Sequence, residues 1–352
     1  MILEYVWLDG YKPEPNLRSK IQVTDDHQWS SKIPPMWSFD GSSTQQADGS
    51  SSDCILKPIK TYKGFDGIDK FVLCEVVNNK SNTRQYIKPS KDWWFAFEQE
   101  YFFYQNGNPL GWRNDIAAPK PQGEFYCGVG PENAVGRNIV EEHLHKCLDA
   151  GIDIKGINAE VALGQWEYQC MGKGIEAADD LWMSRYFLQR IAEKHCVSIN
   201  WQPKPITGDW NGSGLHLNFS NEKMREEGGE EYIKSICESI GKNHDPKKVA
   251  SEYGSDNDKR LTGLHETQSI NEFSYGVSDR GASIRIPVGT VENDWKGRLE
   301  DRRPASNADP YRVLKYLLSS IDGKNAYLDG EIEVADRAEQ MQYISDDAVA
   351  PS

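Results

Sequence analysis

The chain has 352 residues, 38% of them hydrophobic, and its 54 acidic and 40 basic side chains give a net charge of −14. The length and apolar content predict a globular protein of two domains, and the negative charge argues against nucleic acid and membrane surfaces as partners, because both are anionic. With no basic leader, no long apolar span and seven cysteines without a C-x-x-C pair, the sequence favours a cytoplasmic protein with reduced thiols.

The N-terminal part of the chain has the pattern of short strands separated by turns. Residues 2–8 and 71–77 have the β-branched and aromatic composition of strands. A polar stretch at 78–90 follows and ends in Lys-Pro-Ser, which is typical of a linker. We therefore expect a β-rich domain at 1–87 and a larger domain of mixed strands and helices at 88–352.

Two glutamates lie inside the aromatic run 93–103. Glu98 and Glu100 are two residues apart, so in a strand both side chains lie on one face. The flanking aromatic residues predict a buried strand, and two adjacent buried carboxylates are costly unless a cation neutralises them. A divalent metal ion would do so. The alternative is a strand edge with two solvated glutamates.

Further segments place acids or a histidine in apolar surroundings. A strand, a glycine-marked turn and a second strand bring Glu160 and Glu167 to adjacent positions. In the strand at 215–219, His216 and Asn218 share the face opposite the apolar residues, although a lone histidine often has only a structural role. Oxygen ligands with one imidazole favour Mg²⁺ or Mn²⁺ over zinc. The candidate metal ligands are Glu98, Glu100, Glu160, Glu167, His216 and Glu300.

Four arginines accompany these acids in strand-like segments, namely Arg280, Arg285, Arg302 and Arg303. Guanidinium groups bind carboxylate and phosphate oxygens bidentately, so arginines beside a hard metal favour phosphoryl transfer. The alternative is that they form ion pairs that hold the strands together. Neither G-x-x-x-x-G-K-[ST] nor G-x-G-x-x-G after a strand occurs, so a phosphate site here would be built around metal ions.

Apolar residues at helical spacing predict four helices in the second domain, at about 140–148, 177–194, 231–240 and 310–318, the last with Asp309 as its N-cap. In the first of them the apolar stripe includes Leu144 and Leu148, so His143 and His145 are expected at the surface. The acidic, weakly patterned stretch from about residue 335 predicts a loose tail.

Seven segments occur in order along the chain: W-S-F-D-G-S-S-T-Q-Q, W-F-A-F-E-Q-E-Y, G-I-N-A-E-V-A-L-G-Q-W-E, D-W-N-G-S-G-L-H-L-N-F-S, R-L-T-G-L-H-E-T, D-R-G-A-S-I-R-I-P and E-D-R-R-P. Together they resemble the signature motifs of the type II glutamine synthetase family, with similarity from about Leu3 to Leu318. The resemblance implies an α+β fold, with a β-grasp N-terminal domain and a catalytic domain whose curved antiparallel sheet is backed by helices. It also implies a homo-oligomer of two stacked rings with active sites between neighbouring subunits.

Matched residue by residue, the resemblance also implies roles for the site residues. One divalent ion would be bound by Glu100, Glu160 and Glu167 and another by Glu98, His216 and Glu300, with two or three ions per site. ATP would contact Trp94, the segment from Glu167 and Tyr168 to Gly172, Asn218, Phe219 and Ser220, with Arg280 and Arg285 at its phosphates and Arg298 at adenine. Glutamate would be held by Asp209, Trp210, Arg280 and Arg302. The other catalytic residues would be Asp40, from the neighbouring subunit, and Glu266, on a flap over the site.

The implied reaction is the ATP-dependent ligation of ammonia to the γ-carboxylate of L-glutamate. ATP first forms an acyl phosphate, ammonia then attacks, and an acid such as Asp40 takes a proton from ammonium. The alternatives are a γ-glutamyl ligase that uses a larger amine and a non-catalytic scaffold or nitrogen sensor. Two departures from the family pattern concern nucleotide binding: Arg298 replaces a usually aromatic residue, and 119–123 differs from the usual G-P-Q-G. We expect Arg298 to stack on adenine as a cation.

Overall fold

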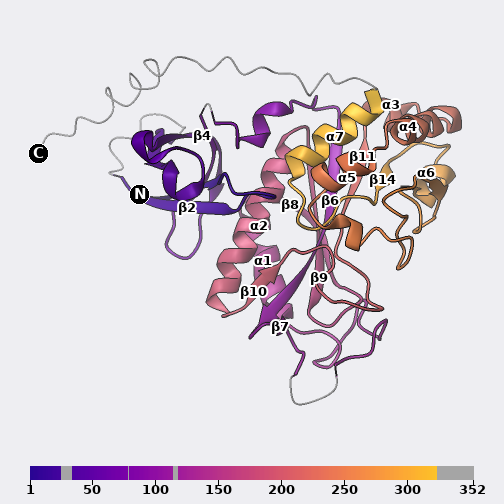
Figure 1. The fold of residues 1–352 in the computed structure, drawn as a ribbon, viewed down its shortest axis with the longest axis horizontal. Coiled ribbons are helices and arrows are strands. Elements are labelled where there is room, and N and C mark those ends of the chain that lie inside the picture. The colour runs from indigo at the N-terminus through magenta and orange to yellow at the C-terminus, as the bar shows by residue number, and fades with distance from the viewer. Residues whose placement is uncertain (25–33, 78, 114–117, 323–352) are drawn as a thin grey trace, which may run out of the picture.

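The computed structural model describes residues 1–24, 34–77, 79–113 and 118–322. The strands form two sheets, one from the N-terminal part of the chain and a larger one from the rest, with helices packed beside and between them (Figure 1). This is the expected α+β fold. The predicted tail from about residue 335 lies outside the described residues.

The smaller sheet has five strands in the order β2-β1-β5-β4-β3. β1 and β5 pair in parallel, and the other pairs are antiparallel. The strands predicted at 2–8 and 71–77 are confirmed as β1 and β5, within one residue. The bounds are β1 Ile2–Leu8, β2 Leu17–Val23, β3 Trp37–Asp40, β4 Asp53–Lys63 and β5 Lys70–Val76.

The larger sheet is organised around β6, the predicted aromatic strand. β6 pairs antiparallel with β9 on one side and with β11 on the other. The main path runs β12-β13-β14-β11-β6-β9-β8 and is antiparallel except between β12 and β13, while β7 and β10 pair with β6. The bounds are β6 Trp94–Gln105, β7 Asn108–Pro109, β8 Asp153–Ala159, β9 Gln165–Lys173, β10 Ser198–Asn200, β11 Leu215–Ser220, β12 Tyr275–Val277, β13 Ile284–Ile286 and β14 Leu299–Asp301.

The helices are α1 Arg137–Asp149, α2 Glu176–Lys194, α3 Glu222–Glu226, α4 Glu230–Lys242, α5 Pro246–Glu252, α6 Val288–Glu292 and α7 Pro310–Asp322. The four predicted helices correspond to α1, α2, α4 and α7. Asp309 accepts a hydrogen bond from the backbone N–H of Tyr311 at 3.0 Å, so it caps α7 as predicted. Within the described ranges, no helix has both the length and the apolar character needed to span a bilayer.

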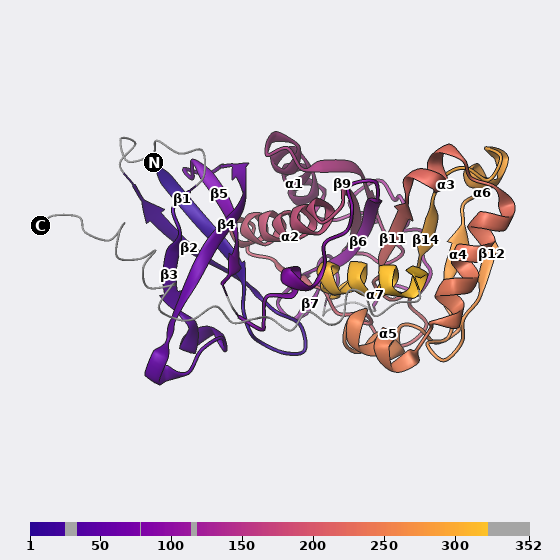
Figure 2. The ribbon, with the colours of Figure 1, turned by 90° about the horizontal axis from the view of Figure 1, so that it is seen from above.

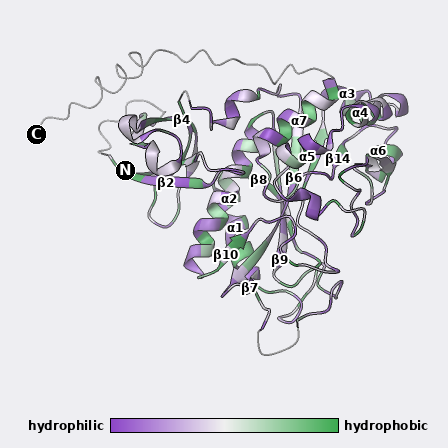
Figure 3. Ribbon diagram, in the orientation of Figure 1, coloured by the Kyte–Doolittle hydropathy of each residue, from purple (hydrophilic) through white to green (hydrophobic). Residues whose placement is uncertain are grey.

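Helix α2 lies between the two sheets (Figure 2). Lys60 Nζ on β4 lies 2.6 Å from a carboxylate oxygen of Asp180 on α2, and the hydroxyl of Tyr186 donates to Glu4 on β1 at 2.5 Å. Phe187 is fully buried. Hydrophobic segments, green in Figure 3, gather around the centre of the larger sheet, which α2 covers on one side. The helix therefore joins the two sheets through both polar and apolar contacts.

Helix α1 differs from its prediction in the face that it buries. Cys147 and His143 are fully buried, whereas Leu148 is 48% exposed. The surface position predicted for His143 is therefore wrong, while His145 is exposed as predicted. His143 Nε2 lies 2.9 Å from the carbonyl oxygen of Ser184 on α2, and burial lowers the pKa of His143 to about 4. This hydrogen bond compensates for burying the imidazole. The buried face of α1 therefore includes His143 and leaves out Leu148, unlike the apolar face predicted from the sequence.

Candidate active site

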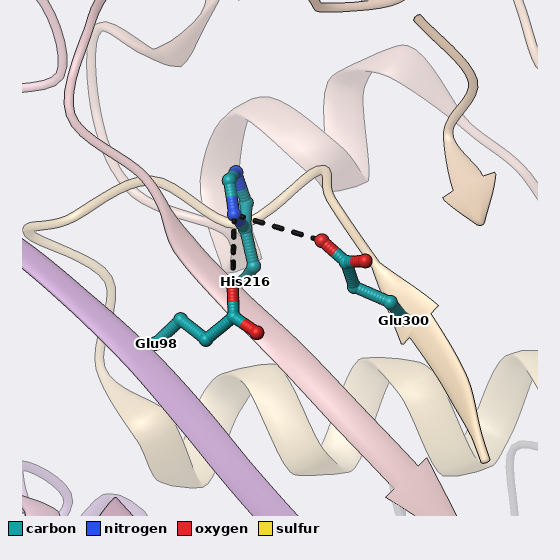
Figure 4. A group of neighbouring side chains, drawn as sticks. All are labelled: Glu98, His216 and Glu300. Carbon is teal, nitrogen blue, oxygen red and sulfur yellow. Dashed lines mark ion pairs between the residues drawn. The ribbon is translucent and has the colours of Figure 1, made fainter. Parts of the chain in front are cut away.

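Three neighbouring strands bring Glu98, His216 and Glu300 together (Figure 4). Glu98 is on β6, His216 on β11 and Glu300 on β14, and His216 is the direct strand partner of Glu98. His216 Nδ1 lies 3.4 Å from Glu98 Oε2 and 3.8 Å from Glu300 Oε1. One possible ligand atom from each residue lies within 4.8 Å of the other two. The strand register thus assembles one of the two predicted metal-ligand trios.

The second predicted trio, Glu100, Glu160 and Glu167, lines the same cavity of about 760 Å³. Glu100 and Glu167 are direct partners across β6 and β9, and Glu160 follows the end of β8. Glu160 accepts hydrogen bonds from Asn158 Nδ2 at 2.9 Å and from the backbone N–H of Val161 at 3.1 Å. All three acids are buried. Their role as ligands stays a prediction.

The electrostatics of this cavity favour bound cations. Burial raises the pKa of Glu100 to about 8, and the nearby charge of Glu160 adds to the effect. Burial raises the pKa of Glu160 to about 7 and, with neighbouring carboxylates, that of Glu167 to about 10. Burial, reinforced by Arg302, lowers the pKa of His216 and leaves a neutral imidazole that can bind a metal ion. At neutral pH the buried carboxyl groups of Glu100, Glu160 and Glu167 are stable only when protons or cations neutralise their charge. The donor set therefore fits a divalent metal ion.

Two of the predicted arginines meet at Glu300. Arg285 donates to Glu300 Oε2 at 2.8 Å, and Arg302 donates to Glu300 Oε1 at 2.6 Å. Both arginines line the cavity, so they give its wall a fixed positive charge. Arg280 is more exposed, and its guanidinium lies 3.7 Å from the carboxylate of Glu266.

Arg303 instead forms a structural ion pair, which was the alternative role considered for the four arginines. It is 2% exposed and donates to both carboxylate oxygens of Asp301, at 2.8 and 2.7 Å. Side chains alternate along β14 and the residues after it, so Glu300 and Arg302 face the cavity while Asp301 and Arg303 face the core.

Two of the residues predicted to bind glutamate, Asp209 and Trp210, lie in different surroundings, and Glu266 of the predicted flap lies near the first of them. Asp209 and Glu266 line the cavity, and Asp209 Oδ1 lies 2.8 Å from His265 Nε2. His265 and Glu266 have positive φ angles of 55° and 59°, a backbone region that is costly for residues other than glycine. Trp210 is 4% exposed, with its ring centroid 5.4 Å from that of Trp112. Its side chain therefore lies in the core beside the cavity.

A second cavity of about 420 Å³ is lined by residues predicted to bind ATP, namely Trp94, Asn218, Phe219, Ser220 and Arg298. Glu98 and Gln169 line both cavities, so Glu98 of the first trio lies where the two meet. Tyr168 is fully buried, and a side chain at Gly172 would come within 2.6 Å of the Ala177 backbone on α2. These two residues thus contribute to packing between β9 and α2.

Asp40 ends β3 in the smaller sheet, and neither cavity is lined by it. Its carboxylate is exposed and accepts hydrogen bonds from the hydroxyl and the backbone N–H of Ser42, at 2.6 and 2.9 Å. The hydrogen bonds from Ser42 lower the pKa of Asp40, which keeps it ionised. Within the described residues of one chain, the site is built without this acid.

Comparisons with known proteins agree on one family. Residues 78–231 match the family model described as "Glutamine synthetase, catalytic domain". The chain is 51% identical over 333 residues to the glutamine synthetase of Bradyrhizobium diazoefficiens, covering 91% of this chain and 95% of that one. It is 44% identical over 340 residues to the glutamine synthetase of Yarrowia lipolytica, covering 92% and 91%. The chain belongs to the glutamine synthetase family.

The fold agrees with that of a solved glutamine synthetase. The cryo-EM structure of the Plasmodium falciparum glutamine synthetase matches with a TM-score of 0.71 at 17% identity, covering 92% of this chain and 72% of that one. At this identity the likeness concerns the fold alone. The predicted fold class and family are both confirmed.

Two arginines that line these cavities were absent from the sequence predictions. Arg260 is buried, lines the first cavity and donates to the carbonyl oxygen of Pro304 at 2.8 Å, and burial lowers the pKa of Arg260 to about 10. Arg225 on α3 lines the second cavity, 4.1 Å from the ring centroid of Trp94. Arg260 opens the R-L-T-G-L-H-E-T motif, which was the available signal. The short acidic segment around Arg225 has no pattern that indicates a site.

Proposed function

We propose that the two adjoining cavities catalyse the ATP-dependent ligation of ammonia to the γ-carboxylate of L-glutamate, giving L-glutamine, ADP and phosphate. Family membership supports this reaction. The observation that carries it is the junction at Glu98, where the cavity with the predicted nucleotide residues meets the cavity lined by acids and arginines. A phosphoryl group transferred at this junction would lie beside both carboxylate trios and the arginines on Glu300.

The donor set suits divalent metal ions. Carboxylates and one imidazole are ligands that Mg²⁺ and Mn²⁺ accept. We infer two or three ions per site, with Glu98, His216 and Glu300 around one and Glu100, Glu160 and Glu167 around another. Such ions supply positive charge that offsets the negative charge of the transferred phosphoryl group.

The arginines that line the cavity would bind the anionic groups of the substrates. Arg285 and Arg302, both held by Glu300, would orient phosphate and carboxylate oxygens in the cavity. We infer that Arg280, Arg302 and Asp209 hold glutamate, with Trp210 supporting the backbone beside Asp209. The flap that carries Glu266 would exclude water, which otherwise hydrolyses the γ-glutamyl phosphate.

Ammonia must lose a proton before it can attack, because ammonium is its main form at neutral pH. Asp40 is ionised and exposed, and we propose that it completes the site of a neighbouring subunit, where it binds ammonium and takes the proton. This arrangement requires a homo-oligomer, which we propose has two stacked rings. It also gives a separate role to the domain proposed at 1–87, beside the catalytic domain at 88–352.

The test is an assay of phosphate release with ATP, L-glutamate and ammonia. The proposed reaction requires ammonia and yields phosphate and glutamine in equal amounts. Turnover that needs a larger amine in place of ammonia would instead indicate a γ-glutamyl ligase. ATP binding without turnover would indicate a scaffold or sensor. The presence of the predicted acids and arginines in one cavity favours the enzyme.

A further inference from the structure

A chain of hydrogen bonds connects the two cavities. Arg298 Nε donates to Asn218 Oδ1 at 2.8 Å, and Asn218 Nδ2 donates to Glu98 Oε1 at 2.8 Å. The other carboxylate oxygen of Glu98, Oε2, faces His216 Nδ1 (Figure 4). The chain thus runs from the wall of the second cavity to the predicted metal ligands of the first.

The chemistry of the two ends fixes the direction of this chain. An arginine Nε–H can only donate, and an ionised carboxylate can only accept. Asn218 satisfies both partners only with Oδ1 towards Arg298 and Nδ2 towards Glu98. Because Asn218 is 6% exposed, turning its amide over would place a buried oxygen against the carboxylate with no donor between them.

We propose that Arg298 is a positioning residue for the metal centre. By holding the Asn218 amide in this orientation, it keeps Glu98 Oε1 hydrogen-bonded and Glu98 Oε2 directed towards the ion bound with His216 and Glu300. The inference rests on the proposed function, because it adds a residue to the same site. This positioning role of Arg298 requires no bound nucleotide. It is compatible with stacking of Arg298 on adenine, because a hydrogen bond in the plane of the guanidinium group leaves the face of that group open.

The side chain of Arg298 can be replaced without removing the hydrogen bonds of its backbone. The backbone of Arg298 is held by Thr290, whose Oγ1 bonds both its N–H and its carbonyl, at 3.2 and 2.8 Å, so a new side chain leaves these bonds intact. Arg225 is a matched control on the wall of the same cavity. Its guanidinium donates to the carbonyl oxygens of Ser220 and Asp92.

The experiment is a Mn²⁺ titration without ATP or glutamate, in which electron paramagnetic resonance measures the free ion. Arg298→Met removes the donor, whereas Arg298→Gln places an amide N–H at the position of Nε. The relevant Mn²⁺ site is the one that is lost in Glu98→Ala. Arg298→Met should lower the Mn²⁺ affinity of this site by about two- to tenfold, the worth of one hydrogen bond. Asn218→Ala should weaken it by about 10- to 100-fold, as expected for direct support of a ligand.

The sign of the change separates positioning from charge. Removing a nearby positive charge strengthens cation binding, so a purely electrostatic effect predicts tighter Mn²⁺ binding in both Arg298 variants. Positioning predicts weaker binding in Arg298→Met but binding at least as tight as wild type in Arg298→Gln. Arg225→Met should stay within about twofold of wild type, because it lacks the link to Glu98. Both variants lose the charge and only Arg298→Met loses the donor, so equal Mn²⁺ affinities of Arg298→Met and Arg298→Gln would overturn the inference.

Failure of the proposed function gives a different result. A protein that binds Mn²⁺ with these differences but makes no glutamine from ammonia would retain the inference and lose the function. A protein that makes glutamine while Arg298→Met and Arg298→Gln have equal Mn²⁺ affinities would retain the function and lose the inference. Circular dichroism checks that each variant is folded. If Arg298→Met is not, Arg298→Leu also lacks a donor and carries the same expectation.

Discussion

Glu100 on β6 and Glu167 on β9 are direct partners across an antiparallel pair, so their two carboxylates share one buried cavity. Burial and neighbouring acids raise their pKa values to about 8 and about 10. Two charges so close in a buried site are unfavourable unless a cation lies between them. Without a metal ion, the pair therefore retains protons at neutral pH.

Metal binding should release these protons. The raised pKa values of Glu100 and Glu167 favour the protonated carboxyls at pH 7 in the metal-free protein, whereas a metal ligand must be ionised. We expect Mn²⁺ affinity to rise between about pH 6 and 8, with proton release at pH 7. Calorimetric titrations in two buffers of different ionisation enthalpy measure the release, and equal heats in both would contradict it.

The same pKa shifts determine how the stability of the metal-free protein depends on pH. The ordinary pKa of Glu167 is 4.5, so between that value and its raised folded-state pKa the folded state binds more protons than the unfolded state. The free energy of unfolding should therefore fall as pH rises from about 5 to 8, and bound Mn²⁺ should reduce the fall. Denaturant unfolding at both pH values measures it. Glu167→Gln is the control, because it should flatten the dependence.

Loss of one ligand from either trio should abolish activity. Glu98→Ala and Glu160→Ala should each stop glutamine formation and weaken Mn²⁺ binding, whereas Glu141→Ala, a change of an exposed acid on α1, should do neither. Metal-free Glu160→Ala should unfold no more easily than metal-free wild type, because one buried acid has been removed from the cluster. Unchanged Mn²⁺ titrations in both ligand variants would exclude the metal site.

A site shared between subunits should allow complementation. Asp40→Ala and Glu300→Ala are each expected to be inactive, but a mixed oligomer would contain some sites with both native residues. Mixing the two proteins under conditions of subunit exchange should restore part of the activity, measured as glutamine formed. Each variant treated alone under the same conditions gives the baseline activity. Subunit exchange without recovery of activity would indicate a site contained in one chain.

Glu266 should protect the acyl phosphate from water. If its flap closes over the site, Glu266→Ala should form less glutamine while ATP cleavage continues, because water then reaches the intermediate. The ratio of phosphate released to glutamine formed should therefore rise above one. Both rates falling together, with the ratio still near one, would assign Glu266 to substrate binding instead.

Strand alternation predicted which acids share a face with one another because alternation is a local property. The aromatic neighbours of Glu98 and Glu100 mark both the strand and its burial, and the same reasoning placed His216 on the face opposite its apolar neighbours. That β6, β11 and β14 lie side by side depends on long-range pairing, which periodicity does not encode. The family resemblance supplied the grouping of Glu98, His216 and Glu300, and the order of their strands comes from the structure.

Other features depend on tertiary partners that a single segment does not reveal. His143 looks like a surface residue in the sequence because its hydrogen-bond partner, the carbonyl oxygen of Ser184, belongs to another helix. Arg225 reaches the second cavity from a short helix that has no motif. The contact between Arg298 and Asn218 joins residues 80 positions apart and required the folded structure.

Helix α2 contacts both sheets, so the placement of one sheet relative to the other depends on how this helix packs. Separating it from the smaller sheet would leave the carboxylates of Asp180 and Glu4 without the partners they have across that boundary. On its other side the helix packs against β9, where Ala177 leaves no room for a side chain at Gly172. Helix α2 thus contacts both the strand that carries Glu167 and the sheet that carries Asp40. If Asp40 lies at a subunit contact, as proposed, the contacts of α2 would link that contact to the cavity lined by the acids.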